Sequence, residues 1–253
     1  MRKQILAVMV GLSVVLSSCS TQSTESMLQE VKKDAKEVKS GKLTMTMDST
    51  DIDKKPIGFN VSGDEKFDPI EANIKGTLKQ AGIDSNIESY IKDGVEYFNS
   101  KFGNEIRWGK SKFIPGERES HNFKKNALNM QDSILNLLDN KDNWDVTKDG
   151  DKVTFKLKKN DETEKKVEEE YKKKVKKNDG EAVRFSKLDY TIEYVFNKKT
   201  KNIEKIFNEV IAETDDNLKI ITTELLEEIN KEVKIELPEE SKSAITIEVQ
   251  SKK

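Results

Sequence analysis

The chain has 253 residues, and its 45 lysine and arginine residues nearly balance its 47 aspartate and glutamate residues. A net charge of −2 leaves no basic excess for binding a phosphate backbone, so the composition excludes a nucleic-acid-binding protein. The single cysteine, Cys19, cannot form a disulfide within the chain, and 34% hydrophobic residues suffice for a buried core if they are well patterned.

The first element is a leader over residues 1–18. Arg2 and Lys3 precede an apolar run over residues 5–16, which is too short to span ~30 Å of hydrocarbon as a helix. The run ends in small residues and Cys19, an order typical of a bacterial lipoprotein signal. We therefore expect cleavage between Ser18 and Cys19 and a thioether from Cys19 to diacylglycerol. Two or more acyl chains, palmitate among them, would hold the mature chain on the extracytoplasmic face of the cell membrane.

Residues 19–26 read as the lipidated terminus and a short polar tether, followed by a single domain over residues 27–253. Loss of Arg2 and Lys3 with the leader changes the net charge from −2 to −4, so the mature composition offers no overall attraction to anionic lipid headgroups. An amphipathic helix opens the domain, with apolar residues at helical spacing from Met27 to Val38, and Gly41 follows its end.

Strands with period-two alternation come next, and each predicts one buried and one wet face. The first carries Met45 and Met47, the second Phe59, and the third Ile74 and Leu78 on its apolar face. Asp93-Gly94 and Asp149-Gly150 each separate two apolar runs, which favours hairpins with two-residue turns.

A second amphipathic helix is expected between Trp108 and Trp144. Ser120 is a candidate N-cap. The apolar positions step by three and four residues and are Phe123, Ala127, Met130, Ile134, Leu137 and Leu138. A third helical segment, over residues 162–178, is highly charged and has a narrow apolar stripe of Val167, Tyr171 and Val175. We expect it to be an insertion that lies over the sheet or projects from it.

The clearest alternation in the chain falls at Tyr190, Ile192 and Tyr194. Strands over residues 203–212 and 218–226 continue it, and shorter strands are expected at 233–237 and 245–249. About ten strands joined mostly by tight turns form an antiparallel meander. The sequence predicts an α+β fold: a strongly curved antiparallel sheet, or half-barrel, covered by two amphipathic helices, with one charged helical excursion.

This layout resembles the LolA/LprG-type half-barrel lipoproteins, in particular a branch common in Gram-positive bacteria. The resemblance rests on the lipidation motif, the helix leading into Val38-Lys39-Ser40-Gly41-Lys42-Leu43, the strand Tyr97 to Trp108 before the central helix, and the strand from Tyr190 to Tyr194 before Pro238. It covers most of the mature chain. The charged segment over residues 162–178 departs from the plain half-barrel.

Such a resemblance implies a hydrophobic concavity that binds a lipid or another apolar molecule and needs no cofactor. The residues that would line it are Met45, Met47, Phe59, Ile74, Leu78, Tyr190, Ile192 and Tyr194. Flexible methionine side chains suit irregular apolar ligands. The alternative for each position is an ordinary core residue, because alternating apolar residues in strands usually fill a core.

Catalytic chemistry finds little support in the sequence. His121 is the only histidine and Cys19 the only cysteine, which removes histidine-based zinc sites and histidine-containing catalytic triads. The twelve glycines form no phosphate-binding loop. Carboxylates are abundant, but none lies in an apolar setting that would perturb its pKa, and Asp139 to Asp151 lack the spacing of an EF-hand. We expect a protein that is not an enzyme and holds no metal.

Two functions remain. The first is a membrane-anchored surface lipoprotein that binds an apolar ligand or lipid in its half-barrel. The second is an envelope scaffold with a filled core that acts on a protein partner, unidentified from sequence, through its charged surface.

Overall fold

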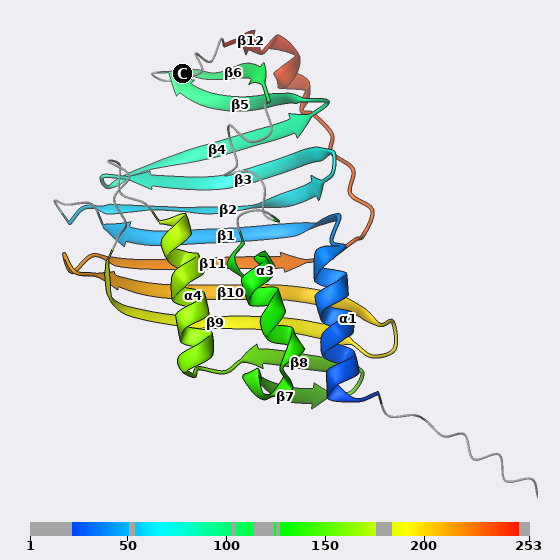
Figure 1. Ribbon diagram of the computed structural model, residues 1–253. Coiled ribbons are helices and arrows are strands. Elements are labelled where there is room, and N and C mark those ends of the chain that lie inside the picture. Colours follow the sequence, from blue (N-terminus) through cyan, green and yellow to red (C-terminus); the bar gives the residue numbers. More distant parts are fainter. Residues whose placement is uncertain are drawn as a thin grey trace, which may run out of the picture.

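The computed structural model describes residues 22–50, 54–102, 105–113, 124, 127–175 and 184–247. The leader, Ser18, Cys19, Ser120, His121 and Phe123 lie outside the described residues. One sheet of twelve strands dominates the fold, in the order β12-β6-β5-β4-β3-β2-β1-β11-β10-β9-β8-β7 (Figure 1). All described pairings are antiparallel except that of β12 with β6. The predicted α+β half-barrel is confirmed, with twelve strands in place of about ten.

The strands are β1 (Ser40–Thr50), β2 (Pro56–Phe67), β3 (Ile70–Gln80), β4 (Ile83–Lys92), β5 (Val95–Phe102), β6 (Glu105–Lys112), β7 (Trp144–Asp149), β8 (Lys152–Leu157), β9 (Phe185–Asn197), β10 (Asn202–Thr214), β11 (Lys219–Glu227) and β12 (Ile245–Thr246). The helices are α1 (Thr24–Lys36), α3 (Asp132–Leu135), α4 (Asp161–Lys174) and the 3₁₀ turns η2 (Leu128–Met130), η3 (Asn136–Asp139), η4 (Lys141–Asn143) and η5 (Glu239–Ser243).

Two glycines allow the sheet to bend between β2 and β3. A Cβ atom on Gly63 would lie 1.6 Å from the carbonyl oxygen of Asn73, and one on Gly76 would lie 2.0 Å from that of Asn60. No side chain fits at either position, so only glycine lets the neighbouring strands twist past each other this closely. The sheet can therefore curve at this point without losing its ladder of hydrogen bonds.

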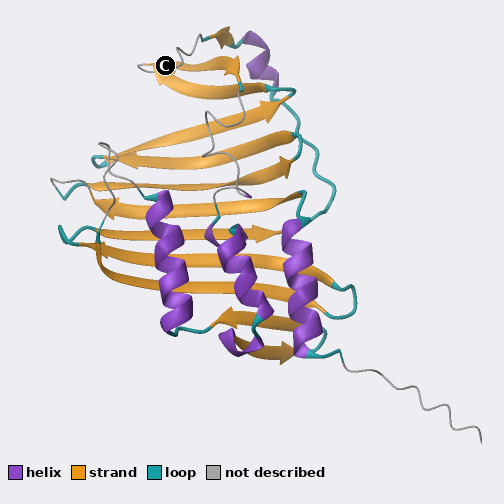
Figure 2. Ribbon diagram, in the orientation of Figure 1, coloured by secondary structure: helices purple, strands orange, loops and turns teal. Residues whose placement is uncertain are grey.

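Three helical segments lie side by side on one face of the sheet, here called the helix face (Figure 2). The predicted N-terminal helix is α1: Ser23 caps it by accepting a hydrogen bond from the Ser26 backbone N–H at 3.2 Å. Its stripe of Met27, Leu28, Val31 and Ala35 is buried. Lys124 Nζ donates to the carbonyl oxygens of Lys36 and Val38, at 2.6 and 3.1 Å, and so satisfies acceptors at the C-terminal end of α1 and just past it.

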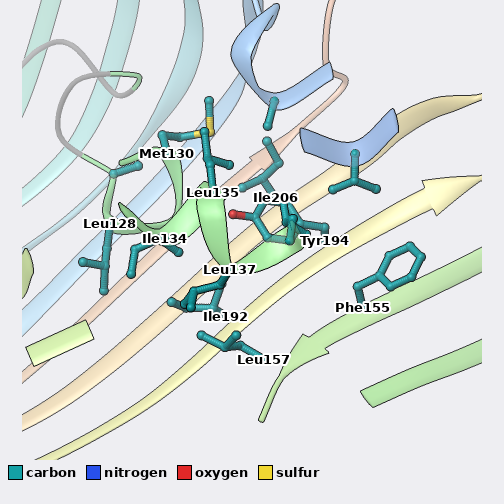
Figure 3. Packing of buried hydrophobic residues seen from close by; sticks show 14 of the residues in the cluster. Leu128, Met130, Ile134, Leu135, Leu137, Phe155, Leu157, Ile192, Tyr194 and Ile206 are labelled. Carbon is teal, nitrogen blue, oxygen red and sulfur yellow. The ribbon is translucent and has the colours of Figure 1, made fainter. Parts of the chain in front are cut away.

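The main core fills the space between these helices and β8 to β11. Tyr194 and Ile206 from the sheet meet Ile134 and Leu137 from the central helical segment (Figure 3). The rings of Trp144 and Tyr194 are 5.6 Å apart. This half of the molecule is a closed, packed interior.

The central helix differs from its prediction. Ala127, Met130, Ile134, Leu137 and Leu138 are all buried as expected. The described segment is a series of short turns, however, because Gln131 adopts an extended conformation (ψ 140°) between η2 and α3. Apolar spacing alone does not reveal such a break.

The charged segment is a third covering helix and does not project. Val167 is fully buried and Tyr171 is 4% exposed on α4. A capping box fixes its start: Asn160 Oδ1 accepts from the Thr163 backbone N–H at 3.1 Å, and Thr163 Oγ1 accepts from the Asn160 N–H at 3.0 Å. Its apolar stripe is narrow but sufficient.

Two smaller expectations are corrected. Residues 233–237 do not form a strand, although Ile235 is buried and its carbonyl oxygen accepts a hydrogen bond from Lys92 Nζ at 2.8 Å. Asp93 and Gly94 both have positive φ, as predicted for their hairpin. In the second hairpin Asp149 pairs with Lys152, so the turn residues are Gly150 and Asp151.

Candidate functional site: an apolar patch beyond the helices

Five of the eight predicted ligand-lining residues lie together on the helix face of β1, β2 and β3. Met47 is opposite Phe59, and Phe59 is opposite Leu78, which makes one row across three strands. In the next row Met45 is opposite Val61, and Ile74 lies opposite Gly63 one row further on. Side chains in such rows touch across the strands, so the five residues form one continuous surface.

This surface extends beyond the helices. In Figure 2 the helices lie over β8 to β11 and reach β1, whereas β2 to β5 continue past them. The apolar side chains there are half-buried, and Leu78 is 38% exposed. We call this set the apolar patch: Met45, Met47, Phe59, Val61, Ile74, Leu78, Ile87 and Phe98.

The patch has defined limits on two sides. Met45 and Ile74 pack against the main core, so the patch begins where the covered interior ends. Further along the strands, the next row runs from Gly41 through Glu65, Ala72 and Ile91 to Glu96. Its two buried carboxylates, Glu65 and Glu96, make polar contacts, whereas Ala72 and Ile91 belong to a second, small hydrophobic cluster. An apolar molecule on the patch would thus lie beside the main core and end at a row that holds two carboxylates.

A polar pair adjoins the patch at its boundary with the core. Glu224 on β11 lies opposite Met45. Asn208 Nδ2 donates a hydrogen bond to Glu224 Oε2 at 3.0 Å. Burial raises the pKa of Glu224 above its ordinary value, opposed by the charge of Lys174. Burial also lowers the pKa of Lys174, at the end of α4, to about 8. A polar headgroup entering here would meet both an acidic and a basic side chain.

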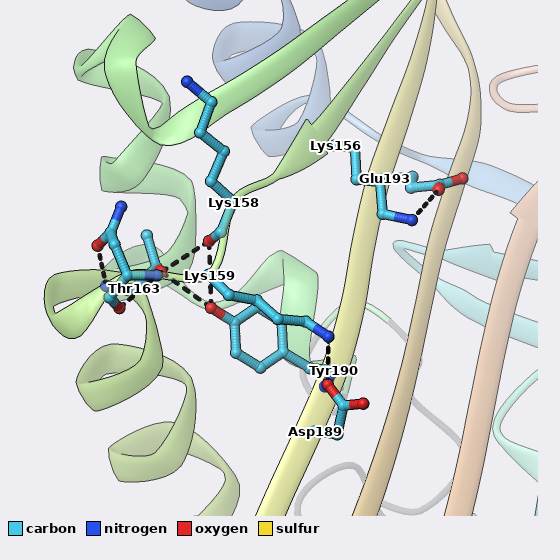
Figure 4. A network of polar contacts seen from close by, with 8 residues as sticks. Lys156, Lys158, Lys159, Thr163, Asp189, Tyr190 and Glu193 are labelled. Atoms are coloured by element: carbon cyan, nitrogen blue, oxygen red, sulfur yellow. Dashed lines mark hydrogen bonds and ion pairs between the residues drawn. The ribbon is translucent and has the colours of Figure 1, made fainter.

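Tyr190, Ile192 and Tyr194 share the helix face but lie beneath the helices. They are 3%, 0% and 0% exposed, and all belong to the main core. The Tyr190 hydroxyl donates within the network that starts α4, at 2.9 Å from Thr163 Oγ1 and 3.2 Å from the Lys158 carbonyl oxygen (Figure 4). The Tyr194 hydroxyl bonds to the carbonyl oxygen of Asn129. These three residues stabilise the filled half of the molecule and are not part of the patch.

Three patch residues were absent from the predicted set: Val61, Ile87 and Phe98. Val61 and Ile87 continue apolar alternations in the sequence, whereas Phe98 is out of phase with Val95 and Tyr97. What selects them is register, since Val61 lies opposite Met45, Ile87 opposite Gly76, and Phe98 opposite Ser89. The Asp93-Gly94 turn fixes the last of these pairings and could have placed Phe98.

A large cleft among the described residues lies elsewhere. It has a volume of about 1550 Å³ and runs from the C-terminal end of α1 along the ends of neighbouring strands. Its lining carries charges of both signs, including Asp34, Lys36, Lys124, Glu227 and Lys231. None of the predicted ligand-lining residues borders it, and such a lining does not suit an acyl chain.

Within the described ranges, no cluster of three or more histidine, cysteine, aspartate or glutamate side chains is arranged to hold a metal ion. No helix in those ranges has the length and apolarity needed to cross a membrane.

Comparison with known proteins gives fold likeness alone. No protein-family model matches the chain, and no curated protein is similar to it in sequence. Among solved structures it is similar to LprF from Mycobacterium bovis, with 14% identity, a TM-score of 0.43, and coverage of 85% of this chain and 96% of that one. It is also similar to a DUF1329 family protein from Desulfovibrio piger, with 7% identity, a TM-score of 0.26, and coverage of 83% and 93%. The fold assignment rests on the sheet order and helix layer described above.

Proposed function

We propose that the mature chain is a surface lipoprotein, anchored through Cys19 at the extracytoplasmic face of the cell membrane, that binds an apolar ligand such as a lipid acyl chain. The ligand lies on the apolar patch, and the protein is a binder or carrier with no catalytic step and no cofactor.

The observation that carries this proposal is the row Met47, Phe59 and Leu78. A soluble domain rarely leaves a contiguous apolar surface on the concave side of a sheet without a partner for it. The adjoining methionines can adapt to the shape of an irregular ligand. The filled core beside the patch argues for shallow binding along the sheet and against engulfment under the helices.

Native mass spectrometry tests the proposal directly. The chain from residue 19, with Cys19→Ser to remove the anchor, retains every described element of the fold. We expect it to carry a stoichiometric acyl species that organic extraction releases and lipid analysis identifies. A bare mass that persists after addition of detergent-solubilised lipids would contradict ligand binding.

The patch can be separated from the rest of the molecule with two matched variants. Phe59→Asn removes an apolar contact from the patch. Phe207→Asn makes the same change on β10, on the opposite face of the sheet, where Phe207 is also half-buried. Burying a phenylalanine side chain contributes about 1.5–3 kcal/mol. We therefore expect Phe59→Asn to weaken binding of a fluorescent fatty-acyl probe by about tenfold or more. Phe207→Asn should leave the affinity unchanged, and equal losses would argue against the patch.

The second candidate, a scaffold that acts on a protein partner, is favoured by the outer face of α4. Val167 and Tyr171 face the core, while Glu164, Lys165 and Glu169 are exposed. If the protein carries no lipid, reversing these three charges tests the scaffold. Partner cross-linking in cells should then fall while the unfolding temperature stays the same.

A further inference from the structure

A hollow of about 680 Å³ lies at the end of the molecule where α1 begins. Gln22, Ser23 and Ser26 from the start of α1 form one side. Four lysines from two neighbouring turns form the other: Lys148 at the end of β7, and Lys198, Lys199 and Lys201 between β9 and β10. Figure 1 shows these turns beside the first turn of α1 (blue).

The lysines are held on a rigid base. The Lys198 backbone N–H donates to the Asp151 carbonyl oxygen at 2.8 Å, which joins the β9–β10 turn to the β7–β8 turn. Asn197 Oδ1 accepts from the backbone N–H groups of Lys199 and Thr200 at 2.9 and 3.2 Å, and so fixes the shape of the turn. Tertiary structure therefore presents the four positive groups together, and we call Lys148, Lys198, Lys199 and Lys201 the lysine surface.

Their charge is not neutralised locally. Among the described residues, none of the four lysines forms an ion pair, whereas nearby Lys141 pairs with Glu25 at 2.5 Å and Lys152 with Glu204 at 3.1 Å. The acids that line the hollow are Glu30 and Asp151, so four positive charges face two negative ones. A chain that is negative overall thus has a local excess of two positive charges here.

The position of this surface identifies its partner. Cys19 precedes the first residue of α1 by five positions, so even a fully extended tether keeps the anchor within about 18 Å of the hollow. We propose that these lysines dock on the anionic phospholipid headgroups of the membrane that holds the anchor. The inference rests on the proposed lipidation of Cys19, and it replaces the expectation, drawn from net charge, that headgroups exert no attraction. Each lysine near an anionic surface adds attraction that salt screens.

Vesicle co-sedimentation of the chain from residue 19 with Cys19→Ser tests the lysines without the anchor. We expect binding to vesicles that contain phosphatidylglycerol, no binding to pure phosphatidylcholine vesicles, and loss of binding as salt is raised. The triple variant Lys198→Gln, Lys199→Gln, Lys201→Gln should bind at least tenfold more weakly.

A matched control removes three lysines elsewhere. Lys79, Lys112 and Lys219 are exposed, lie in β3, β6 and β11, and form no ion pair among the described residues. Their triple glutamine variant should bind like the parent chain, and both variants should keep the parent's unfolding temperature. Equal loss in the two variants, or no binding by the parent to anionic vesicles, would overturn the proposal. Acylation of Cys19 is measured separately, by mass spectrometry of the chain from membranes, so failure of the anchor and failure of the lysine surface are distinguishable.

Discussion

Glu224 is held among apolar and amide side chains on the helix face of β11, between Met45 and Asn208. Burial raises its pKa above the ordinary value of 4.5. Because the folded state favours the protonated form, this carboxyl contributes stability that is fully present below pH 4.5 and is lost as pH rises through the higher folded-state pKa.

Replacing Glu224 by glutamine should therefore change how stability depends on pH. The amide oxygen of Glu224→Gln can still accept the hydrogen bond from Asn208, but the side chain cannot ionise. Relative to the parent, the free energy of unfolding of this variant should rise as the pH is raised above the ordinary carboxyl pKa of 4.5, as measured by urea denaturation over a range of pH. A constant difference across this range would mean that Glu224 is not perturbed by burial.

At the scale of single elements, α4 tests whether a narrow apolar stripe can hold a helix on the sheet. Val167→Ala removes methyl groups from a fully buried position, so we expect a loss of about 1–3 kcal/mol in the free energy of unfolding. Glu169→Ala, on the exposed face of the same helix, should change it by less than about 0.5 kcal/mol. Urea denaturation measures both. Similar small effects would place α4 off the core.

The elements also show which parts of the fold a sequence reveals. Period-two alternation predicted most of the strands, and Asp93-Gly94 predicted a turn, because both are local properties of the chain. The alternation over residues 233–237 did not correspond to a strand. The sequence left open whether the charged segment covers the sheet or projects from it, since charge density is local whereas the packing of Val167 depends on which strands lie beneath α4. Gln131 breaks the central helix because its ψ angle is extended, and the spacing of apolar residues does not predict this angle.

The eight predicted ligand-lining residues fall into two groups, because alternation is local whereas the helix cover is not. All eight predicted residues lie on the helix face, but alternation cannot tell a strand that the described helices cover from one that extends beyond them. Tyr190, Ile192 and Tyr194 are covered by helices, whereas Phe59 and Leu78 lie beyond them. The limit of the helix layer is set by helix number and length, which are properties of the whole domain.

At the scale of the whole molecule, the lysine surface and the apolar patch lie at different places along the sheet. The lysines belong to β7 and to the turn between β9 and β10, and the patch runs across β1 to β5. From β9 the patch begins three strand spacings away at β1 and ends seven spacings away at β5, or about 14 to 34 Å along the sheet at ~4.8 Å each. A domain that rests on its lysines therefore holds the patch away from its own bilayer, facing partners or ligands on the outer side.

Fluorescent labels on the lipidated protein test this orientation. Thr200 lies among the lysines, and Ser85 lies exposed on β4 near the patch. Each can be changed to cysteine for labelling, because the proposed acylation of Cys19 would consume the native thiol. In vesicles with a spin-labelled headgroup, we expect quenching at position 200 and little at position 85, since the quencher acts only over short distances. Stronger quenching at position 85 would place the apolar patch against the bilayer, and the protein would then take its ligand from the membrane that anchors it.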